Sequence, residues 1–104
     1  MTIADLDEVQ YDLEADGELV RRQLDRQVWE QRGWATVAVA YQEREAGGAW
    51  KPAKVALLRF RRMHDAWKKQ SGITLSLAEA RALATTLAGW AETHAAAADL
   101  DDDA

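Results

Sequence analysis

Three consecutive segments between residues 34 and 75 have the composition of β-strands, with a short turn sequence after each of the first two. Residues 34–45 are rich in Val, Thr, Trp and Tyr, with both faces apolar at the start as in a central strand, and residues 54–63 and 66–75 are the next two expected strands. A pair of glycines at 47 and 48 predicts the first turn, because glycine adopts positive φ at little cost, and His64 with Asp65 fits the second. Strands joined by short turns pair in antiparallel fashion, so this region predicts an antiparallel sheet.

A single helix is expected directly after the last of these strands. Ser76 and Glu79 form the S-x-x-E pattern of a capping box, which marks the first turn of a helix over residues 76–94. Apolar residues then recur at helical spacing and form one stripe: Leu77, Ala80, Leu83, Ala84, Leu87, Trp90 and Ala91. Such a stripe must cover a sheet face or meet a partner helix.

The segment before the three strands is ambiguous. Residues 19–32 fit a helix, with Val20, Leu24 and Val28 four apart, or a strand from Arg26 onward. The strand that follows favours a strand for the second half. The predicted fold is therefore α+β, with a four-stranded curved antiparallel sheet followed by one C-terminal α-helix.

Charge is distributed very unevenly along the chain. The formal net charge is −5, yet residues 1–18 and 92–104 contain no Lys or Arg, and all thirteen basic residues lie between them. We therefore expect a basic domain over residues 19–94, flanked by acidic, disordered tails at residues 1–18 and 95–104. Two interpretations of the acidic tails stay open: they only keep the chain soluble, or they compete with phosphate groups for the basic domain.

Composition also narrows the class of protein. A chain of 104 residues predicts one domain, and the lack of cysteine excludes disulfides and thiolate metal sites. No apolar run approaches the ~20 residues of a membrane helix, and residues 1–18 lack the apolar core of a signal peptide. The expected location is intracellular: cytoplasm or nucleoid in a bacterium, nucleus in a eukaryote.

The sequence contains no pattern typical of an enzyme. His64 and His94 have no second metal ligand at a useful spacing, and the capping pattern already accounts for Ser76. The carboxylates of Glu43 and Glu45 fit a solvated strand end better than acid–base chemistry. We therefore predict neither catalysis nor a metal ion nor a cofactor.

The stretch from Trp50 to Leu75 concentrates basic and aromatic residues. It holds seven of the thirteen basic residues and one acid, Asp65. Cations that neutralise phosphates, beside rings on which bases can stack, are typical of single-stranded nucleic-acid binding. The candidate binding residues are Trp50, Lys51, Lys54, Arg59, Phe60, Arg61, Arg62, Trp67, Lys68 and Lys69.

Two questions stay open at this point. Alternation does not settle which sheet face would bind, and the basic run could also be a merely solvated strand face. Trp29, Trp34 and Trp90 are expected to be core or dimer contacts, while Trp50 and Trp67 are equally suited to stacking.

The order of elements and two stretches of sequence resemble the single-stranded-DNA-binding domain of the transcriptional coactivator positive cofactor four. The resemblance covers roughly Gln27 to Ala91. Its most specific part is KKQSGITLS from Lys68 to Ser76, leading into the capped helix, and VALLRFRR from Val55 to Arg62 is the second match. The chain departs from that family at Arg61 and Arg62, where aromatic residues are common, in its long hairpin loop at residues 45–52, and by two residues inserted before Gly72.

The resemblance implies roles for particular residues. Arg59, Lys68 and Lys69 would contact phosphates, and Trp67 would stack on a base. Members of that family are homodimers joined largely through the helix and a sheet edge, which would place Leu83, Leu87 and Trp90 in the dimer interface.

The predicted function is therefore non-enzymatic, largely sequence-independent binding of single-stranded DNA or RNA, in transcription regulation or strand protection. The expected partners are single-stranded nucleic acid, a second copy of the chain and the transcription machinery, but no membrane. The alternative is a protein–protein interaction module without nucleic-acid binding, and a weaker alternative is a chromatin-like protein that prefers duplex.

Overall fold

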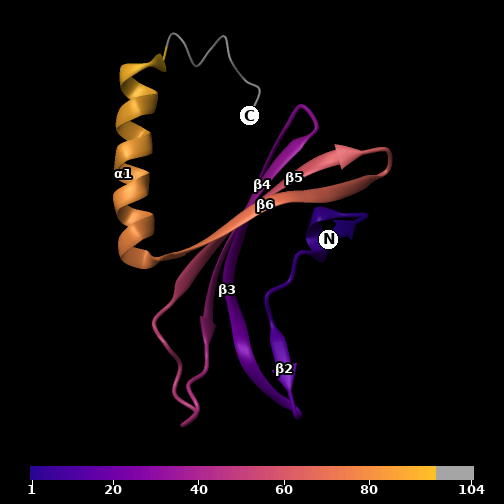
Figure 1. The fold of residues 1–104 in the computed structure, drawn as a ribbon, viewed down its shortest axis with the longest axis vertical. Coiled ribbons are helices and arrows are strands. Elements are labelled where there is room, and N and C mark those ends of the chain that lie inside the picture. Colours follow the sequence, from indigo (N-terminus) through magenta and orange to yellow (C-terminus); the bar gives the residue numbers. More distant parts are fainter. Residues whose placement is uncertain (96–104) are drawn as a thin grey trace.

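A computed structural model describes residues 1–95, which form an antiparallel sheet curled into half a barrel and one helix at its C-terminal end (Figure 1). The sheet has the strand order β1-β6-β5-β4-β3-β2. The strands are β1 (Thr2–Ile3), β2 (Leu13–Ala15), β3 (Glu18–Gln31), β4 (Trp34–Glu43), β5 (Lys54–Met63) and β6 (Ala66–Ser76). A 3₁₀ turn, η1 (Leu6–Glu8), lies between β1 and β2, and the helix α1 spans Leu77–Thr93.

The predicted four-stranded sheet is wrong, because the described residues form six strands. The two additional strands come from the segment expected to be a disordered tail: β1 pairs with β6 at one edge, and β2 pairs with β3 at the other. Strand β3 also begins at Glu18, well before the expected start near Arg26. The C-terminal tail expected at residues 95–104 lies, apart from residue 95, outside the described residues.

The N-terminal segment is ordered because its apolar residues cover one face of the sheet, called here the inner face (Figure 1). Leu6 and Val9 are buried in the core, and Ile3 and Tyr11 pack against it. The remaining core residues come from the strands: Ala35, Val37, Val39, Tyr41, Ala56, Leu58, Phe60 and Trp67. Removing this apolar surface from water outweighs the cost of ordering a short acidic segment.

Arg26 on β3 fixes the N-terminal segment through three hydrogen bonds. One terminal guanidinium nitrogen donates to the carbonyl oxygens of Asp7 and Val9, both at 3.0 Å, and the other donates to the Asp7 carboxylate at 3.2 Å. The acidic segment therefore lies on the inner face. Deleting residues 1–18 would uncover the core, so such a deletion cannot isolate the predicted competition between the acidic segment and phosphate groups.

One tight turn and two register shifts decide which face each side chain of β3–β6 occupies, and the first shift lies in β3 between Gln23 and Asp25. The β3–β4 hairpin turns through Arg32 and Gly33, with φ of 52° and 79°, as a tight two-residue hairpin turn requires. In β6 the register slips by one residue: Arg59 pairs with Ser71, but Phe60 pairs with Lys69. Gln70 is thus the additional residue of a β-bulge, and every side chain before it changes face relative to simple alternation.

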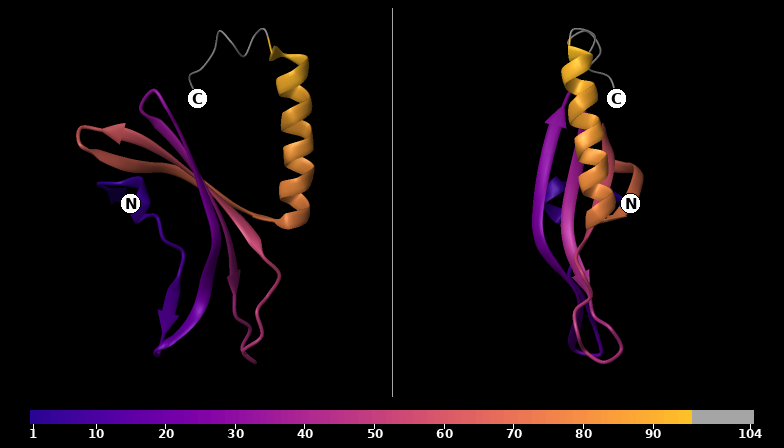
Figure 2. Two further views of the ribbon diagram at one scale, coloured as in Figure 1. Left: turned by 180° about the vertical axis from the view of Figure 1, so that it is seen from behind. Right: turned by 90° about the vertical axis from the view of Figure 1, so that its left-hand side faces the viewer.

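Helix α1 begins as the sequence predicts. The Ser76 hydroxyl accepts a hydrogen bond from the Glu79 amide at 3.1 Å, and the Glu79 carboxylate accepts one from the Ser76 amide at 3.0 Å. The helix then leaves the sheet and stands beside it, on the side opposite the N-terminal segment (Figure 2). None of its residues is buried. In the described part of the chain, no helix is long and apolar enough to cross a membrane.

Candidate nucleic-acid interface

The strand register arranges the side chains of the other sheet face, called here the outer face, in rows that run across β3, β4, β5 and β6. Two rows, called here the cationic rows, lie at the end of the sheet near the β3–β4 turn. The first row consists of Gln31, Trp34, Arg61 and Lys68, and the second of Trp29, Thr36, Arg59 and Ser71. Cross-strand neighbours in such rows approach within ~5–6 Å, so these side chains form one continuous surface.

Trp34 is the centre of the cationic rows. The guanidinium carbon of Arg59 lies 4.8 Å from the centroid of the Trp34 ring, and that of Arg61 lies 4.9 Å from it. Arg59 also donates a hydrogen bond of 2.7 Å to the Thr36 hydroxyl. Cation–π contact and this hydrogen bond hold the planar groups in fixed orientations. Trp29 lies beside them with 58% of its surface exposed.

The charges of these rows are not neutralised within the described residues. Over residues 1–95, no carboxylate forms an ion pair with Arg59, Arg61 or Lys68. Other basic residues do have such partners: Arg26 pairs with Asp7, Arg44 with Glu18 and Lys54 with Glu43. Three positive charges beside the exposed indole ring of Trp29 are therefore open to anionic and aromatic groups from solvent.

Several predicted binding residues lie instead on or near the inner face. Phe60 is fully buried, and Trp67 is 6% exposed because the N-terminal segment lies beside it. Base stacking by either ring does not fit this arrangement. Arg62 is exposed and its guanidinium lies 5.7 Å from the Trp67 ring centroid, while Lys69 pairs with Phe60 on the same side.

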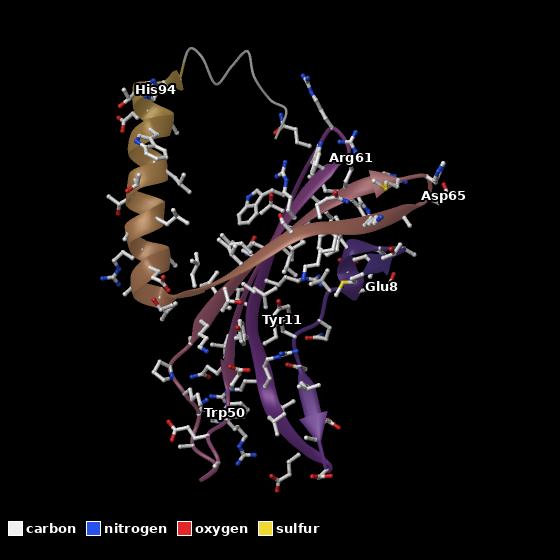
Figure 3. The ribbon with its side chains drawn as sticks, in the orientation of Figure 1. Glu8, Tyr11, Trp50, Arg61, Asp65 and His94 are labelled. Carbon is white, nitrogen blue, oxygen red and sulfur yellow. The ribbon has the colours of Figure 1, made fainter. Side chains whose placement is uncertain are left out.

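Trp50 belongs to a second, separate cluster. Its ring lies 4.1 Å from the Arg22 guanidinium carbon and 5.4 Å from that of Arg44. Lys51 is exposed next to it, and Lys54 is occupied by Glu43. Figure 3 shows Trp50 and Arg61 toward opposite ends of the sheet. Arg22 pairs with Gln42. Because Gln42 lies eight residues along β4 from Trp34, the Trp50 cluster is separated from the cationic rows by about 26 Å at the usual strand rise.

Sequence reasoning thus joined residues that the fold separates, and it missed Trp29 and Trp34 as surface residues. Their place on the surface follows from the pairing of Trp34 with Arg61 and of Thr36 with Arg59. These pairs depend on the β4–β5 register, which the sequence does not reveal. The basic run Trp50–Leu75 contributes Arg59, Arg61 and Lys68 to the cationic rows.

The described residues offer no site for a metal ion. Between residues 1 and 95, no three His, Cys, Asp or Glu side chains come together as ligands. Comparison of the chain with protein-family models, with curated proteins and with solved structures finds no match. The resemblance to positive cofactor four therefore stays a prediction.

Proposed function

We propose that the chain binds single-stranded nucleic acid on the cationic rows of its outer face. The observation that carries this proposal is the group of Arg59, Arg61 and Lys68, none of which has an ion-pair partner in residues 1–95, next to the exposed ring of Trp29. No catalytic group or cofactor is required, because binding is the whole activity.

The chemistry of the site favours single strands with little sequence preference. Arginine and lysine bind phosphate oxygens, which are the same in every nucleotide. Indole rings stack on any base for ~1–3 kcal/mol, and a duplex hides the base faces that such stacking needs. A role in transcription regulation or strand protection rests on the family resemblance alone.

The direct test is quenching of tryptophan fluorescence by an oligo-thymidine at several salt concentrations. We expect quenching at low salt and a linear decline of the logarithm of the association constant with the logarithm of salt concentration. Replacing Trp29 by Phe should remove a large part of the quenching. A competing duplex of the same length should displace the oligonucleotide poorly.

Neighbouring arginines provide a matched pair of variants. Arg61→Gln should reduce the magnitude of the salt slope by ~0.7, the value for one phosphate contact on a single strand. Arg62→Gln removes the same charge from the inner side of β5 and should leave the slope unchanged. Equal effects of the two variants would refute the assignment to the outer face. Absence of both quenching and a gel shift at low salt would refute nucleic-acid binding and favour the interaction module.

A further inference from the structure

The apolar stripe of α1 has no partner within the described chain. Leu77, Leu83, Leu87 and Trp90 expose 51%, 36%, 49% and 61% of their surfaces. Large apolar side chains repeated along one face of a helix are typically covered in the folded protein. Single exposed apolar residues are normal on a protein surface, but a continuous stripe of them points to an interaction site.

The outer face carries a second uncovered apolar surface, next to the cationic rows. Its two rows, called here the apolar rows, consist of Gln27, Ala38, Leu57 and Ile73, followed by Asp25, Ala40, Val55 and Leu75. Ile73 is 51% exposed, and beside it a hollow of about 210 Å³ opens between Leu57, Arg59 and Gly72. Two rows occupy a band about 13 Å wide, which is close to the ~10–12 Å diameter of a helix.

The chain's own helix cannot fill this band. Ser76 is both the last residue of β6 and the N-cap of α1, so no linker allows the helix to fold back. Figures 1 and 2 show α1 extending away from the point where it joins β6, with the sheet to one side. Within α1, Ala80 alone is half-buried, and every other residue is exposed.

We propose that α1 of a second copy of this chain packs across the apolar rows, and that the exchange is reciprocal. Each copy would then give its helix and receive the other, which is the self-complementary contact of a two-fold dimer. Ala38 and Ala40 in the centre of the band allow close approach of a helix, and Leu83, Leu87 and Trp90 supply the bulk that these small residues lack. This inference does not rest on the proposed function.

The surface area and the charges fit this occupant. The two stripes and two bands together expose on the order of 1,000 Å² of apolar surface, which is near the lower limit of stable interfaces. Helix α1 carries Glu79, Arg81 and Glu92, a net negative charge, and the band borders the cationic row that contains Arg59. The one acid of the band, Asp25, lies at its β3 end, away from β5 and β6. The contact differs from the predicted one, since it uses a sheet face and not a sheet edge.

The first test is the molar mass of the full chain by light scattering during size-exclusion chromatography. We expect twice the chain mass of 11.6 kDa. Leu87→Glu and Leu57→Glu should each halve the measured mass, whereas Thr85→Glu, on the opposite side of α1, should not change it. A wild-type chain that stays monomeric at every concentration would overturn the inference. The cover of α1 would then have to be a different protein or a lipid surface.

Crosslinking tests the geometry without risk of unfolding. The chain has no cysteine, so single cysteines report only the designed contacts. Leu57→Cys protein mixed with protein carrying a cysteine at position 83, 87 or 90 should form a mixed disulfide under mild oxidation for at least one helix position. Thr85→Cys should form none with Leu57→Cys. A dimer that gives no crosslink between position 57 and the stripe would overturn the proposed packing.

Discussion

Leu6 provides the sharpest test of whether the N-terminal segment belongs to the core. Its side chain is 6% exposed and is held on the inner face by η1. Truncating a buried leucine to alanine costs ~2–5 kcal/mol, because apolar contacts are lost and a cavity remains. Leu6 lies in a short segment that can relax toward the sheet, so we expect about 2–3 kcal/mol for Leu6→Ala. With a urea dependence of ~1–3 kcal/mol per molar, the midpoint of unfolding should fall by ~0.7–3 M.

The control for Leu6→Ala is Leu13→Ala, a chemically identical change in β2 at a side chain that is 47% exposed. We expect it to cost less than ~1 kcal/mol, since a surface leucine leaves no cavity. Both variants should be unfolded at the same protein concentration, because association would add to the measured stability. A cost below ~0.5 kcal/mol for Leu6→Ala, or equal costs for both variants, would contradict the assignment of residues 1–12 to the core.

Three further predictions concern the helix cap and the tyrosine on the inner face. Ser76→Ala should lower the free energy of unfolding by ~1 kcal/mol, measured by chemical denaturation, because the first turn loses its cap. Hydrogen bonds from the backbone and then the side chain of Ser76 hold the pKa of Glu79 below its usual value. The stability that this carboxylate contributes is therefore present above its unfolded pKa and is lost as pH falls through the folded pKa. Acid should consequently reduce the helicity seen by far-ultraviolet circular dichroism less in Glu79→Gln than in the wild type. Burial first, and the neighbouring Tyr41 second, raise the pKa of Tyr11 against the opposing effect of Arg21. The stability linked to neutral Tyr11 is then present below its unfolded pKa and is lost as pH rises through the folded pKa. An ultraviolet titration should show one late-ionising phenol, which loses its proton at a higher pH than a free tyrosine, and Tyr11→Phe should remove it.

Each of these outcomes can fail in a specific way. An unchanged unfolding midpoint for Ser76→Ala would mean that the cap contributes nothing to the folded state. Identical acid transitions of the wild type and Glu79→Gln would contradict the lowered pKa. A Tyr11→Phe variant that retains the late-ionising phenol would contradict the raised pKa of Tyr11.

The sequence alone determined the features that depend on neighbouring residues. The start of α1 follows from Ser76 and Glu79, because a capping box satisfies backbone amides within one turn. The turn at His64 and Asp65 likewise follows from local chemistry, and β5 and β6 meet there as predicted. Such features need no information about distant parts of the chain.

Only the tertiary structure decided which residues share a surface. The bulge at Gln70 sets the faces of Lys68 and Lys69, and one residue of slip reverses every assignment that alternation would give. Trp34 meets Arg59 and Arg61 through strand register, over a separation of more than twenty residues. The N-terminal segment was misjudged for the same reason: its acidic composition is local, whereas burial of Leu6 and Val9 depends on an inner face built from strands that follow much later in the chain.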